Sequence, residues 1–224
     1  MQEIHLGIGA VKEVDPLTGV DFLGEVPAST FITGDALASA IGLTAGTAQN
    51  TNEPWLKFEL DGKTLYVAKK TFRYRTSWSQ INSRGAVFGT STVVIQGDTY
   101  KVRLLKGATS DPTANVSGHD PEPSWGSEWN RLLYPLVPNP TNTPTHPVSQ
   151  EGIRYGAFAN YTEAELNIGS GSGYGQYSWC QETNANNTSQ CVRRGDAGLS
   201  DFYLGSFTTT ATSSGWRPVL ELVE

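Results

Sequence analysis

The sequence predicts a loop-rich fold of the α+β class, on three observations. Of the 224 residues, 17% are charged and 10% are aromatic, and Gly, Ser, Thr and Asn are plentiful. Helical bundles need many Ala, Glu, Lys and Leu, so this composition favours strands and loops. Two strand–turn–strand patterns occupy the middle of the chain. Residues 215–223 place Gly, Trp and an Arg-Pro step before alternating apolar residues, which is typical of a last strand tied into a sheet.

The first 50 residues differ in character from the rest. They are rich in small residues, with a turn at residues 15–19 and one helix pattern at residues 35–41 that Gly42 ends. A polar linker follows at residues 44–54. We interpret residues 1–50 as an N-terminal attachment arm or small segment, and residues 55–224 as the main domain.

Two hairpins and a short helix are expected next. Residues 55–60 and 64–68 alternate in polarity on either side of Asp61-Gly62, a strong hairpin signal. Residues 92–95 and 99–105 repeat the pattern around a turn at Gly97. Between the two hairpins, Ser77 is placed to cap a short helix.

The second half alternates loops with short elements. Ser127 is expected to open a helix in which Trp129, Leu132 and Leu133 share one face. A surface excursion follows in the proline-rich stretch 138–147. A helix is also expected to start at Thr162. The remaining strands are expected at residues 177–180, 202–204 and 219–222, with flexible or polar loops at residues 169–175 and 181–190.

Charge and hydropathy exclude some classes of partner. The net charge is −6 and the 16 Lys and Arg residues are mostly scattered, whereas nucleic-acid binding needs a basic face. The N-terminal residues resemble no signal peptide, and no run approaches the roughly 18 apolar residues of a membrane span. We expect a soluble protein made in a cytoplasm, with no nucleic-acid partner and no membrane insertion.

Cys180 and Cys191 are the only cysteines. A disulfide between them would close the loop 181–190 and contribute about 3 kcal/mol on a chain-entropy account. A cytosolic protein would keep both thiols reduced, whereas a particle released from the cell would allow the bond, so both alternatives stay open. A metal pair is not expected, because there is no further Cys and no His lies nearby in the sequence.

Four elements occur in an order that resembles a known family. They are residues 100–105, the helix at residues 127–132, the strand at residues 177–180 and the terminal stretch 215–219. Together they resemble C-type-lectin-like domains of the branch related to sulfatase-modifying factors, as found in bacteriophage virion and tail proteins. The resemblance covers residues 55–224. It implies a mixed domain with a small twisted antiparallel sheet, two or three short helices and long loops.

The same resemblance implies a non-enzymatic structural protein located on a virion. Such a protein would bind a host receptor or glycan at a tail fibre or baseplate, or would decorate the capsid or tail. It would contact other virion proteins through its N-terminal arm and form a homo-oligomer. The Glu-Pro-Asn and Trp-Asn-Asp signatures of calcium-dependent lectins are absent, and so is the spacing of the redox cysteines of sulfatase-modifying enzymes. Neither a calcium cofactor nor that enzymatic activity is therefore implied.

Candidate ligand-binding residues come from three places in the second half. Trp125, just before the helix, is a candidate sugar-stacking platform, although packing within the fold is the favoured interpretation. The two polar loops resemble antibody paratopes, in which Tyr offers rigid contact area and Asn adaptable hydrogen bonds. The loop candidates are Tyr174, Tyr177, Asn184, Asn186 and Asn187.

A carbohydrate-active hydrolase is the alternative from another class. It would use two carboxylates within about 10 Å in a cleft, one with a raised pKa. Asp120 and Glu122 offer such a pair, in a loop that also holds Asp111 and His119. That loop lacks the regular spacing of a calcium site, and no Ser or Cys nucleophile stands out. We therefore assign no catalytic residue and no metal site, and expect Trp216 and Arg217 to have structural roles.

Overall fold

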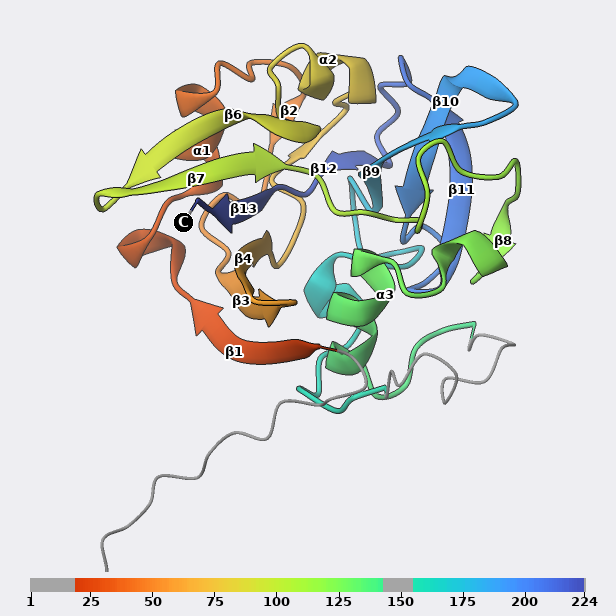
Figure 1. Ribbon diagram of the computed structural model, residues 1–224, viewed down its shortest axis with the longest axis horizontal. Coiled ribbons are helices and arrows are strands. Elements are labelled where there is room, and N and C mark those ends of the chain that lie inside the picture. The colour runs from red at the N-terminus through yellow and green to blue at the C-terminus, as the bar shows by residue number, and fades with distance from the viewer. Residues whose placement is uncertain (1–18, 143–154, 224) are drawn as a thin grey trace, which may run out of the picture.

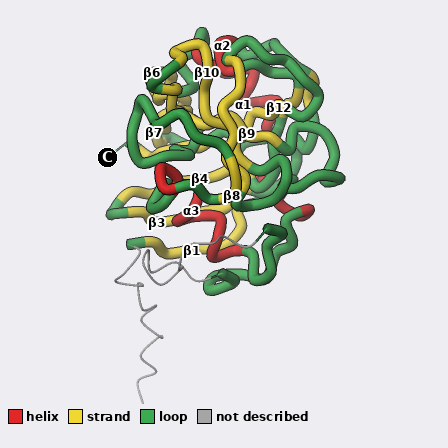
Figure 2. Tube along the Cα trace, turned by 90° about the vertical axis from the view of Figure 1, so that its right-hand side faces the viewer, coloured by secondary structure: helices red, strands yellow, loops and turns green. Residues whose placement is uncertain are grey.

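The computed structural model describes residues 19–142 and 155–223 (Figure 1). They form an α+β domain of mostly antiparallel strands arranged in two sheets. The described residues contain three short α-helices: α1 (Gly34–Ala40), α2 (Trp78–Asn82) and α3 (Glu128–Leu133). Figure 2 shows loops running over the strands at the end of the molecule where β8 and β9 lie.

The first sheet has six strands. Their spatial order is β1 (Val20–Val26), β3 (Trp55–Leu60), β4 (Lys63–Ala68), β13 (Val219–Leu222), β7 (Asp98–Arg103) and β6 (Phe88–Ile95). The two expected hairpins, β3–β4 and β6–β7, are confirmed. Asp61, Gly62, Gln96 and Gly97 all have positive φ at their turns, as the favoured two-residue hairpin loop requires. The C-terminal strand β13 lies between β4 and β7 and so joins the two hairpins.

The second sheet has seven strands. Their order is β2 (Thr47–Ala48), β5 (Arg73–Tyr74), β12 (Ser214–Trp216), β9 (Tyr177–Asn184), β10 (Asn187–Arg194), β11 (Asp201–Ser206) and β8 (Gly118–His119). Only the β12–β9 pair is parallel. The prediction of a loop at residues 181–190 is wrong. β9 and β10 form one long hairpin there, with a turn at Ala185 and Asn186.

The start of the chain also differs from expectation. β1 pairs along its length with β3, from Val20 opposite Leu60 to Val26 opposite Trp55. Helix α1 buries Leu37 and Ala38 in the core. Residues 20–50 therefore belong to the domain, because they supply an edge strand and core side chains. The attachment arm remains a prediction for residues 1–18, which lie outside the described residues.

Helix starts follow from their capping residues. The Ser127 Oγ accepts from the Asn130 N–H at the start of α3, and Ser77 and Gln80 form a reciprocal capping box at α2. Both expected caps are confirmed. The helix expected at Thr162 is a single 3-10 turn, Ala164–Leu166.

The junction between β12 and β13 ties the two sheets together. Trp216 and Arg217 are fully buried, which supports the structural roles expected for both. The Arg217 guanidinium donates to the Ser178 Oγ at 3.0 Å, to the carbonyls of Ala68 and Lys69 at 3.0 and 2.5 Å, and to the carbonyl of Leu166. These acceptors come from β9, from β4 and the residue after it, and from the 3-10 turn. One arginine therefore links three parts of the core.

Candidate functional site

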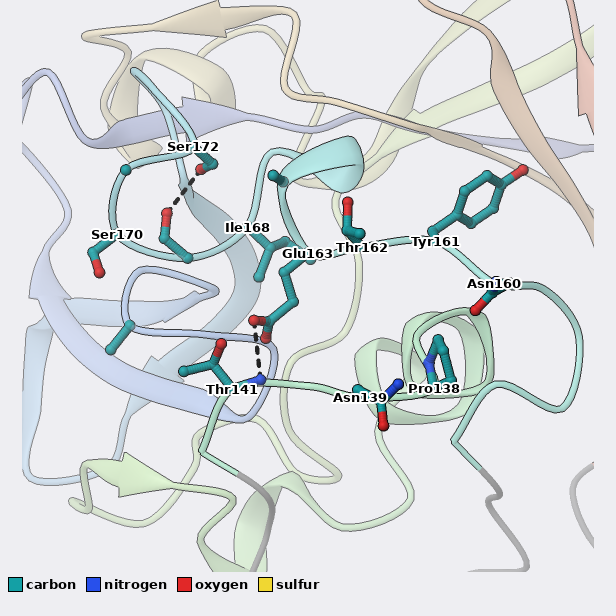
Figure 3. Close-up of a pocket in the computed structure, with 14 residues that line it drawn as sticks. Pro138, Asn139, Thr141, Asn160, Tyr161, Thr162, Glu163, Ile168, Ser170 and Ser172 are labelled. Atoms are coloured by element: carbon teal, nitrogen blue, oxygen red, sulfur yellow. Dashed lines mark hydrogen bonds between the residues drawn. The ribbon is translucent and has the colours of Figure 1, made fainter.

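A cleft of about 560 Å³ opens between three loops (Figure 3). Its walls are residues 138–141, 160–164 and 168–172, together with Ala197. Small-molecule sites commonly have volumes of about 300–1,000 Å³. Polar and small side chains dominate the lining, so the cleft suits a ligand held by hydrogen bonds better than an apolar one.

Glu163 holds the walls of this cleft in place. Its Oε2 accepts from the Thr141 N–H at 3.0 Å, and its Oε1 accepts from the Leu199 N–H at 2.5 Å. Figure 3 shows the carboxylate pointing to the Thr141 backbone across the cleft. Because backbone N–H groups occupy both oxygens, Glu163 acts as a positioning residue for the loops.

Several side chains around the cleft remain available to a ligand. Asn139, Asn160 and Ser170 are exposed, and none makes a side-chain hydrogen bond within the described part of the chain. Asn139 and Asn160 lie on one side of the cleft and Ser170 on the other (Figure 3). The site therefore presents amide and hydroxyl groups from opposite walls.

The Gly/Ser loop at residues 168–172 is anchored by Asn167. This residue is buried in a left-handed conformation, and its Nδ2 donates to the Ser172 carbonyl at 3.1 Å. Its Oδ1 accepts from the Thr71 hydroxyl at 2.5 Å. The loop predicted from its glycines is therefore fixed at its base, while Gly171 has open space around it. The sequence did not single out Asn167 or Glu163.

The two candidate tyrosines lie outside this cleft. Tyr174 is 57% exposed and stacks on Tyr74, with ring centroids 4.7 Å apart. Tyr177 is half-buried and covers the guanidinium of Arg193, which lies 4.2 Å from the ring centroid. Tyr203 lies on the same guanidinium at 5.1 Å. Tyr174 presents free aromatic surface, whereas Tyr177 is engaged in a packed cluster.

Trp125 is half-buried, and its indole N–H donates to the Asp120 carbonyl at 3.0 Å. It does not line the cleft. These contacts favour packing over a free stacking platform.

The asparagine candidates divide between core and surface. Asn184 is fully buried, and its Nδ2 donates to Asn115 Oδ1 at 2.7 Å and to Gln190 Oε1 at 2.8 Å. Its own Oδ1 accepts from the Asn186 N–H. Asn184 therefore shapes the β9–β10 turn, and its assignment as a ligand-binding residue is wrong. Asn186 and Asn187 are exposed at the hairpin tip, away from the cleft lining.

Cys180 and Cys191 are both free and buried. Cys180 packs into the core cluster that contains Val192, and Cys191 into the cluster that contains Trp179. The disulfide that the sequence left open is therefore absent, because the two side chains enter different parts of the core. Burial raises the pKa of both thiols, that of Cys191 to about 12.

The carboxylate pair of the hydrolase alternative is divided by burial. Asp120 is 3% exposed, and its Oδ1 accepts from the Ser124 hydroxyl, the Asn130 amide and the Tyr134 hydroxyl at 2.8–2.9 Å. Glu122 is exposed. Neither lines the cleft. Asp120 belongs to a buried polar network that continues through Asn130 to Arg194.

Residues 19–142 and 155–223 contain neither a metal-binding cluster nor a membrane-spanning helix. No group of three or more His, Cys, Asp or Glu side chains there could hold a metal ion. No helix in that part of the chain has the length and apolar character needed to cross a membrane.

No protein-family model matches the chain, and neither a curated protein nor a solved structure shows significant similarity to it.

Proposed function

We propose that this chain is a non-enzymatic structural protein of a bacteriophage virion, with a C-type-lectin-like domain that binds a host-surface glycan in the polar cleft. The proposal rests in part on the ordered elements that resemble phage lectin-like domains. These elements correspond to β7, α3, β9 and the β12–β13 junction. Fold resemblance alone does not establish a function, so the proposed glycan binding rests on the groups that line the cleft.

The observation that carries the proposal is the set of exposed amide and hydroxyl groups on opposite walls of the cleft. Asn139 and Asn160 offer donors and acceptors, and Ser170 adds a hydroxyl. Glu163 accepts hydrogen bonds from the backbone N–H groups of Thr141 and Leu199, so the loops that carry these residues are already ordered. Ligand binding therefore costs little further loop entropy. Sugar hydroxyls match such groups in hydrogen-bonding capacity.

Several copies would strengthen this binding on the particle. A cleft without a large apolar wall gives modest affinity at one site. Linked copies in a symmetric assembly raise the overall affinity through effective concentration. We propose a homo-oligomer that residues 1–18 attach to other virion proteins.

Binding of the labelled full chain to host cells tests the cleft. The variant N139A/N160A/S170A removes two amides and one hydroxyl from the cleft. Its matched control, N186A/N187A/S189A, removes the same groups from the exposed tip of the β9–β10 hairpin. We expect the affinity of the cleft variant for host cells to fall by about tenfold or more, and the control variant to bind as the wild type does.

The opposite pattern would move the binding site to the hairpin and overturn the cleft assignment. Host polysaccharide incubated with the chain tests the non-enzymatic part separately. A time-dependent release of reducing ends would contradict that part and favour a hydrolase.

A further inference from the structure

A second cleft, of about 490 Å³, lies on the first sheet and shares no lining residue with the first. Charged side chains from β4, β7, β13, α3 and the neighbouring loops surround it. A smaller cleft of about 210 Å³ shares four of its residues, Leu60, Asp61, Lys106 and Glu128, and adds Arg131. The charged residues of this combined groove are Asp61, Lys63, Lys101, Arg103, Lys106, Glu128, Arg131 and Glu221.

Two arginines hold the carboxylates of this groove. Arg103 is 5% exposed and donates to both oxygens of Glu128 at 2.7 and 2.9 Å, and to Glu221 at 2.8 Å. Arg131 donates to both oxygens of Asp61 at 2.7 and 2.6 Å. Bidentate pairs of this kind are the stronger form of charged hydrogen bond, so the carboxylates are already well occupied.

The three lysines have weaker contacts. Lys63 Nζ lies 3.5 Å from Glu221 and Lys101 Nζ lies 3.9 Å from it, with side chains 63% and 46% exposed. Lys106 is exposed, and its ammonium has no ion pair within the described residues. Five cationic side chains against three carboxylates leave a formal charge of +2 in the groove, whereas the chain as a whole carries −6. The groove is therefore a local site of positive charge.

Phe88 adds an exposed aromatic ring to the same groove. It is 47% exposed, lies opposite Arg103 in the β6–β7 pair and lines the cleft. The register of this pair shifts between Phe88 and Ser91, and Gly89 has a φ of +80°. Such bulges re-aim a side chain, often next to a functional site. A ring of this kind offers a flat apolar face against which a sugar ring can pack.

We propose that this groove binds an anionic saccharide, one that carries carboxylate or phosphate groups. Lys63, Lys101 and Lys106 attract its charges, and Phe88 packs against a sugar ring. The lysines act as mobile point charges, while the arginines keep the frame of the groove in place. Lys63 and Lys101 stand on strands that flank β13, so their backbones are held rigidly. This site is independent of the polar cleft proposed above.

Calorimetric titration of the full chain with oligogalacturonate, and with a neutral malto-oligosaccharide of equal length, tests the proposal. We expect the charged oligomer to bind, the neutral one to bind much more weakly, and added salt to weaken the charged interaction through screening. The variant K63Q/K101Q/K106Q is expected to reduce affinity for oligogalacturonate by about tenfold or more.

Charge-matched and cleft-matched controls make the result specific. K57Q/R75Q/R84Q removes three positive charges outside the groove, and N139A/N160A/S170A alters only the polar cleft. Both variants are expected to keep oligogalacturonate binding. F88A is expected to weaken binding of oligogalacturonate but not of inorganic phosphate. Thermal unfolding of each variant confirms that it is folded.

Three results would overturn the proposal. Equal binding of the neutral and charged oligomers would show that charge has no role. Equal loss of oligogalacturonate affinity in K63Q/K101Q/K106Q and K57Q/R75Q/R84Q would show that only the net charge of the protein matters. Lysine-dependent binding to vesicles of anionic phospholipid, with no binding of oligogalacturonate, would assign the groove to a membrane surface. Failure of the polar cleft to bind glycan would leave this proposal standing, because the two sites share no residue.

Discussion

Lys101 and Glu221 are directly opposite each other on β7 and β13, yet the closest carboxylate oxygen is 3.9 Å from the lysine ammonium. The other oxygen of Glu221 accepts from Arg103 Nε at 2.8 Å. Arg103 is nearly buried, whereas Lys101 is 46% exposed. The arginine therefore makes the stronger pair, and the lysine remains available at the surface.

Arg103→Met is expected to destabilise the protein by about 3–5 kcal/mol, because Glu128 and Glu221 lose the cation that compensates their partly buried charges. Urea unfolding measures this change. Lys101→Met is the matched control and is expected to change stability by less than about 1 kcal/mol. Equal effects of the two substitutions would show that Arg103 is not the dominant partner.

Glu182→Gln is expected to change the pH dependence of stability. Burial raises the pKa of Glu182 from 4.5 to about 8, although its Oε2 accepts from the Gly107 N–H. Between those pH values the folded protein keeps a proton that the unfolded chain has released. This group therefore makes the free energy of unfolding fall as pH rises from about 4.5 to about 8.

Glutamine has the same shape and no proton to lose. Glu182→Gln is therefore expected to be more stable than the wild type at pH 8, by a few kcal/mol, and to differ little from it at pH 4.5. Urea unfolding at both pH values tests this. The same difference between variant and wild type at the two values would contradict the assignment.

Trp216→Ala is expected to lower the free energy of unfolding by about 3–5 kcal/mol, because a large and fully buried ring is lost between the sheets. Trp216→Phe keeps an aromatic ring and is expected to cost less. Thermal unfolding of both variants measures the effect. An unchanged Tm for the alanine variant would show that the ring contributes no packing at the junction.

The two cysteine thiols are expected to be unreactive toward a thiol reagent in the native protein, because both are buried and their pKa values are raised. In denaturant, both are expected to react. Adding a reductant should leave the Tm unchanged. A Tm that falls on reduction would indicate a disulfide between Cys180 and Cys191.

Removal of residues 1–50 is expected to prevent folding, because it deletes β1 and the core residues of α1. Removal of residues 1–18 alone is expected to leave a folded domain that no longer attaches to the particle. Circular dichroism and particle binding measure the two properties. A folded product from the longer deletion would place the domain boundary near residue 50 after all.

Local signals account for what the sequence predicted well. Turn pairs such as Asp61-Gly62 mark hairpins by their own conformational preference, and Ser77 and Ser127 mark helix starts through side-chain caps. These signals need no knowledge of distant contacts. The hairpins and both caps were therefore predictable.

Other features depend on contacts that local patterns do not reveal. β1 escaped prediction because a bulge between Phe22 and Gly24 interrupts its alternation. β10 escaped because its first half is polar and exposed, and because Arg193 and Arg194 are buried against aromatic rings and backbone carbonyls. The cleft is lined by three loops that are separate in the sequence, so its residues share no common sequence signal.

Immunogold labelling of native phage particles, with an antibody to the folded domain of residues 19–223, tests the central claim most directly. The proposed function predicts gold on the particle, concentrated at the tail tip if the polar cleft recognises the host surface. Particles that carry no label, while the same antibody detects the protein in the infected cell, would contradict the assignment of this chain to the virion.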